Sequence, residues 1–125
     1  MGIIPYLLQR CKAMEQFLET ALAAARSAAQ VALGYYRGDF EVEVKSDQSP
    51  VTVADRKAEE IIRATLLDAF PDHGFFGEES GKQQEDAEYL WLVDPIDGTK
   101  SFVDGYGMWS TQIELMHRGE LVLGV

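Results

Sequence analysis

Residues 89–99 have the sequence YLWLVDPIDGT, in which an apolar run ends in two carboxylates. A short apolar run bounded by polar residues is typical of a buried strand. Pro95 fixes the backbone at one point of the segment that follows, and Gly98 allows an unusual conformation at another. The stretch therefore predicts a buried strand over residues 89–93 that delivers Asp94 and Asp97 into a constrained turn.

A second acidic pair stands in the same position after another strand. Residues 74–77 (GFFG) predict a buried strand, and Glu78 and Glu79 follow it directly. Each acidic fragment alone is explained by ordinary turn composition or by a solvated surface. Carboxylates that crowd together repel, so the joint occurrence favours a bound cation, and hard cations such as Mg²⁺ prefer oxygen ligands. The candidate metal ligands are Glu78, Asp94, the carbonyl of Ile96 and Asp97.

The residues after the second aspartate favour phosphate chemistry. Gly98 and Thr99 are predicted to begin a helix, whose unpaired backbone amides would face an anion beside the metal. The Thr99 hydroxyl, next to a carboxylate, could orient a water molecule and help to deprotonate it. A plain helix N-cap is the alternative interpretation of Thr99, and the two roles are compatible.

The N-terminal part predicts one long helix. Apolar residues recur at three- and four-residue steps over about residues 14–36, and Gly38 supplies a stop. Residues 1–13 do not continue this period and are interpreted as an N-terminal extension without an assigned function. Residues 40–44 alternate as a half-exposed strand does, and residues 45–50 predict a loop. The expected buried face of the helix comprises Phe17, Leu18, Ala21, Leu22, Ala25, Ala28, Ala29, Ala32, Leu33 and Tyr36.

A second helix is predicted to start at a capping box. Thr52 and Asp55 have the spacing of that motif, and an apolar stripe follows until the helix ends before Pro71. Its stripe comprises Ala58, Ile61, Ile62, Thr65, Leu66 and Ala69. Asp55 therefore has a ready structural explanation.

The rest of the chain predicts a solvated loop and a hairpin. Residues 80–88 are polar and charged, which is typical of a surface loop. Residues 111–116 and 120–125 are apolar strands joined by a turn at 117–119. Together with the helices, these strands predict an α+β fold with two amphipathic helices on a largely antiparallel sheet.

Charge and composition exclude several classes of function. The 125 residues carry a formal charge of −10, which repels nucleic acid and anionic lipid headgroups. The apolar start of the chain is too short and too broken by proline to span a membrane, and the one cysteine, Cys11, fits a reducing compartment. We expect a cytoplasmic protein. Cys11, His73 and His117 are not candidate nucleophiles, because such residues are more often structural or solvated.

Two motifs carry a resemblance to a known family. Residues 77–80 (GEES) and 91–102 (WLVDPIDGTKSF) resemble the inositol monophosphatase superfamily. The similarity extends upstream to Lys45, Thr52 and Asp55, and it covers nearly everything after Met14. The resemblance implies that residues 14–125 are the metal-binding N-terminal part of a phosphatase domain, half of a layered α-β-α-β-α sandwich.

The same resemblance assigns roles to individual residues. It implies that Glu78, Asp94, the carbonyl of Ile96 and Asp97 bind Mg²⁺, and that Glu78 belongs to the catalytic set. It also implies that Asp55 and Thr99 polarise the attacking water, that the Gly98 and Thr99 amides bind phosphate, and that Glu79 supports the site. The expected reaction is in-line attack of metal-activated water on a phosphate monoester, without a covalent phosphoenzyme.

Residues 100–102 (KSF) bear on the substrate. They look closer to histidinol-phosphate phosphatases than to inositol phosphatases, which more often carry Thr-Asn-Phe, while the related bisphosphate nucleotidases carry Lys-Glu-Phe. We rank histidinol phosphate slightly ahead of inositol phosphate and keep a 3'(2'),5'-bisphosphate nucleotidase as an alternative. The expected partner is a small phosphorylated metabolite.

Two alternatives from other classes remain. The chain could be a non-catalytic module that binds a divalent metal, although such a module has no need of the Thr99 hydroxyl. It could also be a structural half-domain that pairs with another chain through its C-terminal strand, which leaves a homodimer open. Members of the superfamily are longer than this chain, and their remaining part supplies a further metal-binding aspartate. We therefore expect the 125-residue chain alone to bind metal weakly and to hydrolyse poorly.

Overall fold

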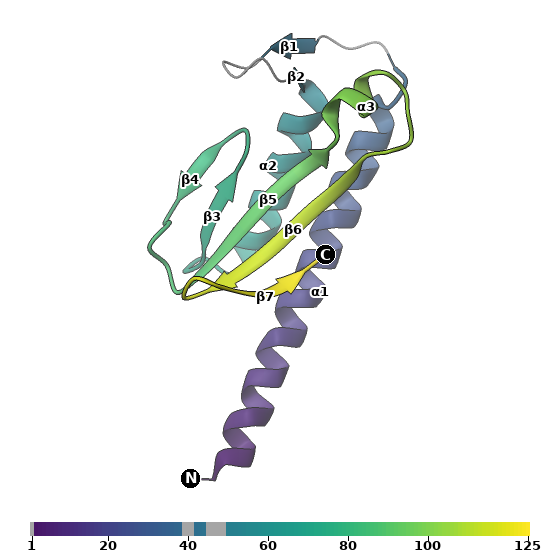
Figure 1. Cartoon of the computed structure of the whole chain (residues 1–125). Coiled ribbons are helices and arrows are strands. Elements are labelled where there is room, and N and C mark those ends of the chain that lie inside the picture. The colour runs from purple at the N-terminus through teal and green to yellow at the C-terminus, as the bar shows by residue number, and fades with distance from the viewer. Residues whose placement is uncertain (1, 39–41, 45–49) are drawn as a thin grey trace.

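The computed structural model describes residues 2–38, 42–44 and 50–125. Helix α1 (Ile3–Tyr35) and helix α2 (Val53–Ala69) lie side by side and cover the same face of a five-stranded sheet (Figure 1). The short helix α3 (Thr99–Val103) follows the central strand. The α+β class, with two main helices on a largely antiparallel sheet, is as predicted.

The order of the strands places the two acidic segments next to each other. The large sheet has the order β4-β3-β5-β6-β7, and β1 and β2 form a separate two-stranded sheet. Strands β3 and β5 are parallel, with Gly77 opposite Val93, while the other neighbouring strands are antiparallel. Because parallel strands end at the same edge of a sheet, Glu78 and Asp94 emerge together. The strands are β1 (Val42–Val44), β2 (Pro50–Thr52), β3 (Gly74–Gly77), β4 (Gly81–Gln83), β5 (Tyr89–Asp97), β6 (Ser110–His117) and β7 (Glu120–Gly124).

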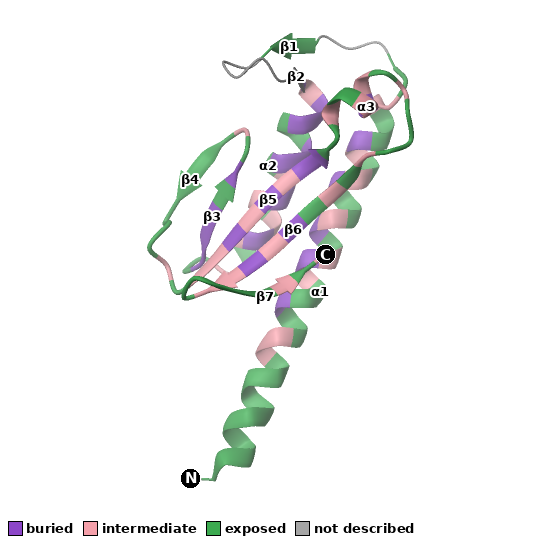
Figure 2. Ribbon diagram, viewed as in Figure 1, coloured by how far each residue is buried: buried purple, intermediate pink, exposed green. Residues whose placement is uncertain are grey.

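The first helix is longer than its periodicity indicates. We predicted a start near Met14, but α1 begins at Ile3 and runs without a break. Residues 2–12 are exposed along the whole circumference of the helix, so burial imposes no readable period there (Figure 2). Two predicted core positions, Leu18 and Leu33, are 40% and 52% exposed. The buried residues of α1 are Phe17, Ala21, Ala24, Ala28 and Ala32, of which Ala24 was missed.

The second helix starts as predicted. Thr52 caps α2 in a capping box with Asp55, and both side chains are buried. Ile62 and Leu66 enter the main core together with Phe75, Trp91 and other side chains from the sheet. Ala69, predicted to belong to the same stripe, is exposed. The small alanines of α1 let the two helices pack closely against each other.

His73 is buried and contacts a core aromatic residue. The side chain of His73 is 8% exposed and accepts a hydrogen bond of 3.1 Å from the indole nitrogen of Trp91. Burial lowers the pKa of His73, which favours the neutral ring that this acceptor role requires. The other histidine, His117, contacts Glu88 at 2.8 Å.

Several local predictions need correction. The interval 80–88, predicted as a loop, contains strand β4, whose polar residues are exposed and pair only with β3. Pro50 begins β2 rather than ending a loop, and β1 is exposed at all three positions rather than half-exposed. The remaining predictions for residues 39–41 and 45–49, including those for Phe40 and Lys45, lie outside the described residues. No helix in the described part of the chain is long and apolar enough to cross a membrane.

Candidate active site

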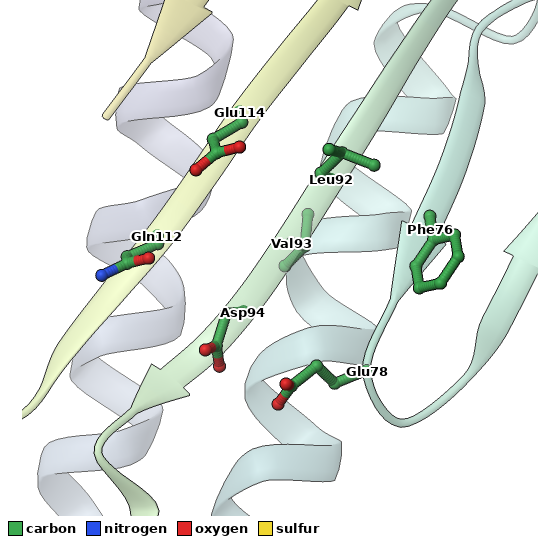
Figure 3. A pocket seen from close by; sticks show the side chains of 7 residues that line it. All are labelled: Phe76, Glu78, Leu92, Val93, Asp94, Gln112 and Glu114. Carbon is green, nitrogen blue, oxygen red and sulfur yellow. The ribbon is translucent and has the colours of Figure 1, made fainter.

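Two of the candidate acidic residues, Glu78 and Asp94, line a pocket on the sheet face that the helices do not cover. Alternate side chains of β5 point to opposite faces: Trp91 and Val93 are buried, whereas Leu92 and Asp94 are only partly covered. The pocket has a volume of about 390 Å³, and the carboxylate of Glu78 points toward Asp94 within it (Figure 3). Its lining residues are Phe76, Glu78, Leu92, Val93, Asp94, Gln112 and Glu114.

The pocket crowds negative charge around Asp94. Burial, followed by the charges of Glu78 and Asp97, raises the pKa of Asp94 to about 7. Its Oδ1 atom is buried and finds no hydrogen-bond donor within the described residues. A carboxylate oxygen in this condition lacks the compensation that burial of a charge demands. A bound cation would supply it.

Asp97 and Ile96 lie at the irregular end of the same strand. We predicted a turn over these residues, but β5 continues to Asp97, and its pairing with β6 changes register between Asp94 and Asp97. Such an irregularity re-aims side chains next to functional sites. Asp97 is exposed, and its Oδ2 atom accepts a hydrogen bond of 3.0 Å from Gln112.

The structure brings Asp55 and Thr99 into direct contact. The Thr99 hydroxyl lies 3.1 Å from Oδ1 of Asp55 and 3.1 Å from the carbonyl oxygen of Ile96. The other oxygen of Asp55 accepts two hydrogen bonds of 2.8 Å from the backbone and hydroxyl of Thr52. Asp55 is 1% exposed, so the capping box also holds its carboxylate rigidly toward Thr99.

Gly98 allows the chain to turn from β5 into α3. It is the N-cap residue of α3 and has φ 89° and ψ 42°, in the left-handed region that glycine adopts without steric cost. A Cβ atom at this position would approach the carbonyl oxygen of Met108 at 2.8 Å. The predicted helix after Gly98 is present, although it has only five residues.

We expect Gly98→Ala to destabilise the chain by at least about 1–2 kcal/mol, because a side chain disfavours the left-handed conformation and meets Met108 as well. Urea unfolding followed by circular dichroism measures the effect. Gly107→Ala is the matched control, since a Cβ atom there meets nothing within 4 Å. Equal unfolding midpoints for the two variants would contradict the expectation.

The sequence analysis missed one further carboxylate, Glu59. Glu59, on α2, is 1% exposed and accepts hydrogen bonds from the backbone amides of Glu79 and Ser80. A signal was present, because an acidic residue stands in line with the buried Asp55, Ile62 and Leu66 at helical spacing. We took that face of the helix to be apolar only.

The candidate ligands suit a hard divalent cation, although they are not arranged as a complete metal site. Every candidate side-chain ligand is a carboxylate, and the charges of Glu78, Asp97 and Asp55 all raise the pKa of Asp94. Within residues 2–38, 42–44 and 50–125, however, no three His, Cys, Asp or Glu side chains are already drawn together as a metal site. The residues therefore fit Mg²⁺ by the chemistry of their donor atoms, and binding would have to draw the carboxylates closer together.

Comparisons with known proteins identify the family of this chain. The model of the inositol monophosphatase family matches residues 13–125. Histidinol-phosphatase of Chlorobaculum parvum is 42% identical over 109 residues, which cover 86% of this chain and 42% of that protein. Bifunctional phosphatase IMPL2 of Arabidopsis thaliana is 39% identical over 114 residues, which cover 90% of this chain and 33% of that protein.

A solved structure shows the same fold. The inositol monophosphatase of Anabaena (Nostoc) sp. PCC 7120 aligns with a TM-score of 0.75 at 32% identity, covering 90% of this chain and 40% of that one. The chain thus spans between 33% and 42% of the length of these three proteins. The predicted family resemblance is confirmed.

Proposed function

The chain belongs to the inositol monophosphatase family, and from this premise we propose that its activity is the Mg²⁺-dependent hydrolysis of a small phosphate monoester. The observation that carries the proposal is the contact of 3.1 Å between Thr99 and the buried Asp55, beside the carboxylates around Asp94. A module that only binds metal has no use for this hydroxyl.

We assign the metal to four ligands, namely Glu78, Asp94, the carbonyl of Ile96 and Asp97. When bound, Mg²⁺ supplies activation of water and neutralises charge on the phosphate oxygens. The support for this assignment is the all-oxygen donor set and the buried, uncompensated oxygen of Asp94.

Thr99 and Asp55 would handle the proton of the attacking water. The Thr99 hydroxyl has one hydrogen and two acceptors at equal distance, Asp55 and the carbonyl of Ile96. With the carbonyl engaged as a ligand, that hydrogen is left to Asp55. A lone pair of Thr99 Oγ1 would then accept a hydrogen bond from water, which orients the water oxygen for in-line attack. As the water proton moves to Oγ1, the hydrogen of the Thr99 hydroxyl would pass to Asp55, so that the water oxygen gains negative character and Asp55 ends protonated. We propose that no phosphoenzyme forms.

The backbone amides of Gly98 and Thr99 are our candidates for contacts to the phosphate. Support comes from the position of Gly98 at the N-cap of α3, directly after the acidic end of β5. Lys100 is exposed and one residue further on, so it is available for a second anionic group or for solvent.

Histidinol phosphate is our first candidate substrate, and inositol monophosphate is the second. The sequence KSF at residues 100–102 supports this order, while proteins named for each activity are among the relatives. Residues 1–13 are treated as an extension outside the phosphatase domain. We further propose a cytoplasmic protein, on the grounds of the single exposed Cys11. A homodimer stays a prediction.

The test is Mg²⁺-dependent phosphate release from histidinol phosphate and inositol 1-phosphate, measured side by side. The 125-residue chain is compared with a version extended to the length of its relatives, and Asp94→Asn is the control. We expect turnover by the extended version, little by the chain alone and none by the control. An extended version that is inert on both substrates would favour the nucleotidase or the metal-binding module instead.

A further inference from the structure

The buried Glu59 has no part in the chemistry proposed above. Its carboxylate is 1% exposed, and its neighbours Ala58 and Ile62 on α2 are buried apolar residues. Moving a carboxylate out of water is unfavourable unless hydrogen bonds compensate for the lost solvation. Its partners therefore indicate why the charge is there.

Those partners all belong to the segment that carries Glu78. Oε1 of Glu59 accepts a hydrogen bond of 2.9 Å from the amide of Glu79, and Oε2 accepts one of 2.5 Å from the amide of Ser80. Hydrogen bonds from backbone amides to a charged carboxylate are shorter and stronger than neutral ones. They fix the backbone immediately after Glu78.

Gly77 makes this approach possible. A Cβ atom at Gly77 would overlap the carboxylate of Glu59, so a side chain there would displace this carboxylate from its present position. The absence of a side chain at residue 77 and the buried charge at residue 59 are thus parts of one contact. On its other side, Gly77 pairs with Val93 of β5, directly before Asp94.

One face of helix α2 therefore contacts both segments of the candidate site, the one that follows β5 and the one that follows β3. Asp55 contacts Thr99 after β5, and Glu59, one turn further along, holds the turn after β3. We propose that Glu59 is a positioning residue, which acts through the backbone of Glu79 and Ser80 to hold Glu78 toward Asp94. The inference rests on the proposed metal site, since Glu78 is one of its ligands.

The test uses the ¹⁵N-labelled 125-residue chain and NMR titration with Mg²⁺, a method that also measures weak binding. Glu59→Gln keeps the size of the side chain but turns an acceptor oxygen into an amino group facing a backbone donor. Loss of a group that orients a metal ligand weakens metal affinity by about 10- to 100-fold, and we expect a rise of this size in the Mg²⁺ dissociation constant. Glu60→Gln is the matched control, because it removes the same charge from an exposed neighbour.

A second measurement needs no variant. In the unchanged chain without metal, the amides of Glu79 and Ser80 are expected to exchange with solvent more slowly than those of the exposed residues 85 and 86. Equal exchange rates would show that the Glu59 contact does not hold the turn, and would overturn the inference even if Glu59→Gln did not fold.

The titration separates the two proposals. If Glu59→Gln binds Mg²⁺ as tightly as the unchanged chain, Glu59 has no positioning role, while the proposed function stands. If the unchanged chain does not respond to Mg²⁺ at all, the proposed metal site is overturned and the role of Glu59 with it. Weakening in Glu59→Gln but not in Glu60→Gln supports both.

Discussion

At pH 8 and without divalent cations, Asp94→Asn is expected to melt at a higher temperature than the unchanged chain. Crowding and burial raise the pKa of Asp94 to about 7 in the folded state, well above the ordinary value of 3.8. The folded state therefore binds a proton that the unfolded state releases between pH 3.8 and 7. Over this range the stability of the unchanged chain falls as pH rises, and the loss is complete above pH 7.

The variant has no charge at this position and escapes the loss. The difference in melting temperature should be close to zero near pH 3 and reach a plateau above pH 7. A change of 1 kcal/mol moves the melting temperature of a domain of this size by roughly 2–8 °C, so differential scanning fluorimetry can follow it.

Mg²⁺ should reverse the order. A cation that binds the folded state raises its melting temperature, and we expect this for the unchanged chain but not for Asp94→Asn. Glu114→Gln is the control, because Glu114 lines the same pocket without raising the pKa of Asp94. A variant that melts below the unchanged chain at pH 8 without metal would contradict the electrostatic interpretation of Asp94.

Thr99→Val should abolish most of the proposed hydrolysis while leaving the metal ligands intact. Valine keeps the shape of threonine but removes the hydroxyl that lies 3.1 Å from Asp55. A positioned proton acceptor contributes about 10²- to 10⁴-fold to a rate, and we expect a loss in this range in phosphate release by the extended version. Thr99→Ser should retain most of the activity.

The variant also leaves Asp55 short of one donor, which costs about 1–3 kcal/mol of stability. Thr65→Val is the matched control, since the Thr65 hydroxyl only bonds the carbonyl of Ile61 within α2. Circular dichroism confirms that both variants fold. If Thr99→Val hydrolyses as fast as Thr65→Val, Thr99 does not act on the water.

The sequence predicted the two strands that carry the acidic residues well. Residues 74–77 and 89–93 are apolar in a short run, and burial on the sheet is the simplest cause of that pattern. The parallel pairing of β3 with β5 could not be predicted from either segment alone, because it depends on contacts between residues distant in sequence. It is this pairing that joins Glu78 to Asp94.

The errors have physical causes too. Strand β4 consists of Gly81, Lys82 and Gln83, all exposed, so neither alternation nor apolar character marks it. The early start of α1 was missed because residues 2–12 bury nothing. Glu59 was missed because the buried face of α2 was predicted from its apolar residues, and a charged residue at the same helical spacing was expected to be exposed.

The register of the central strand β5 determines both which of its side chains enter the core and which face the candidate site. In β5 the indole of Trp91 and the carboxyl of Asp94 belong to opposite faces, so a one-residue deletion upstream of them within the strand would exchange the faces. Trp91 would then turn toward the open pocket, and Asp94 would turn toward the helices. Such a deletion would therefore disrupt the core and the candidate site together, so it could not change the reaction while preserving the fold. Substitution of the exposed Asp97, by contrast, leaves the buried side chains of the strand in place, so this architecture can lose a candidate metal ligand without losing its core.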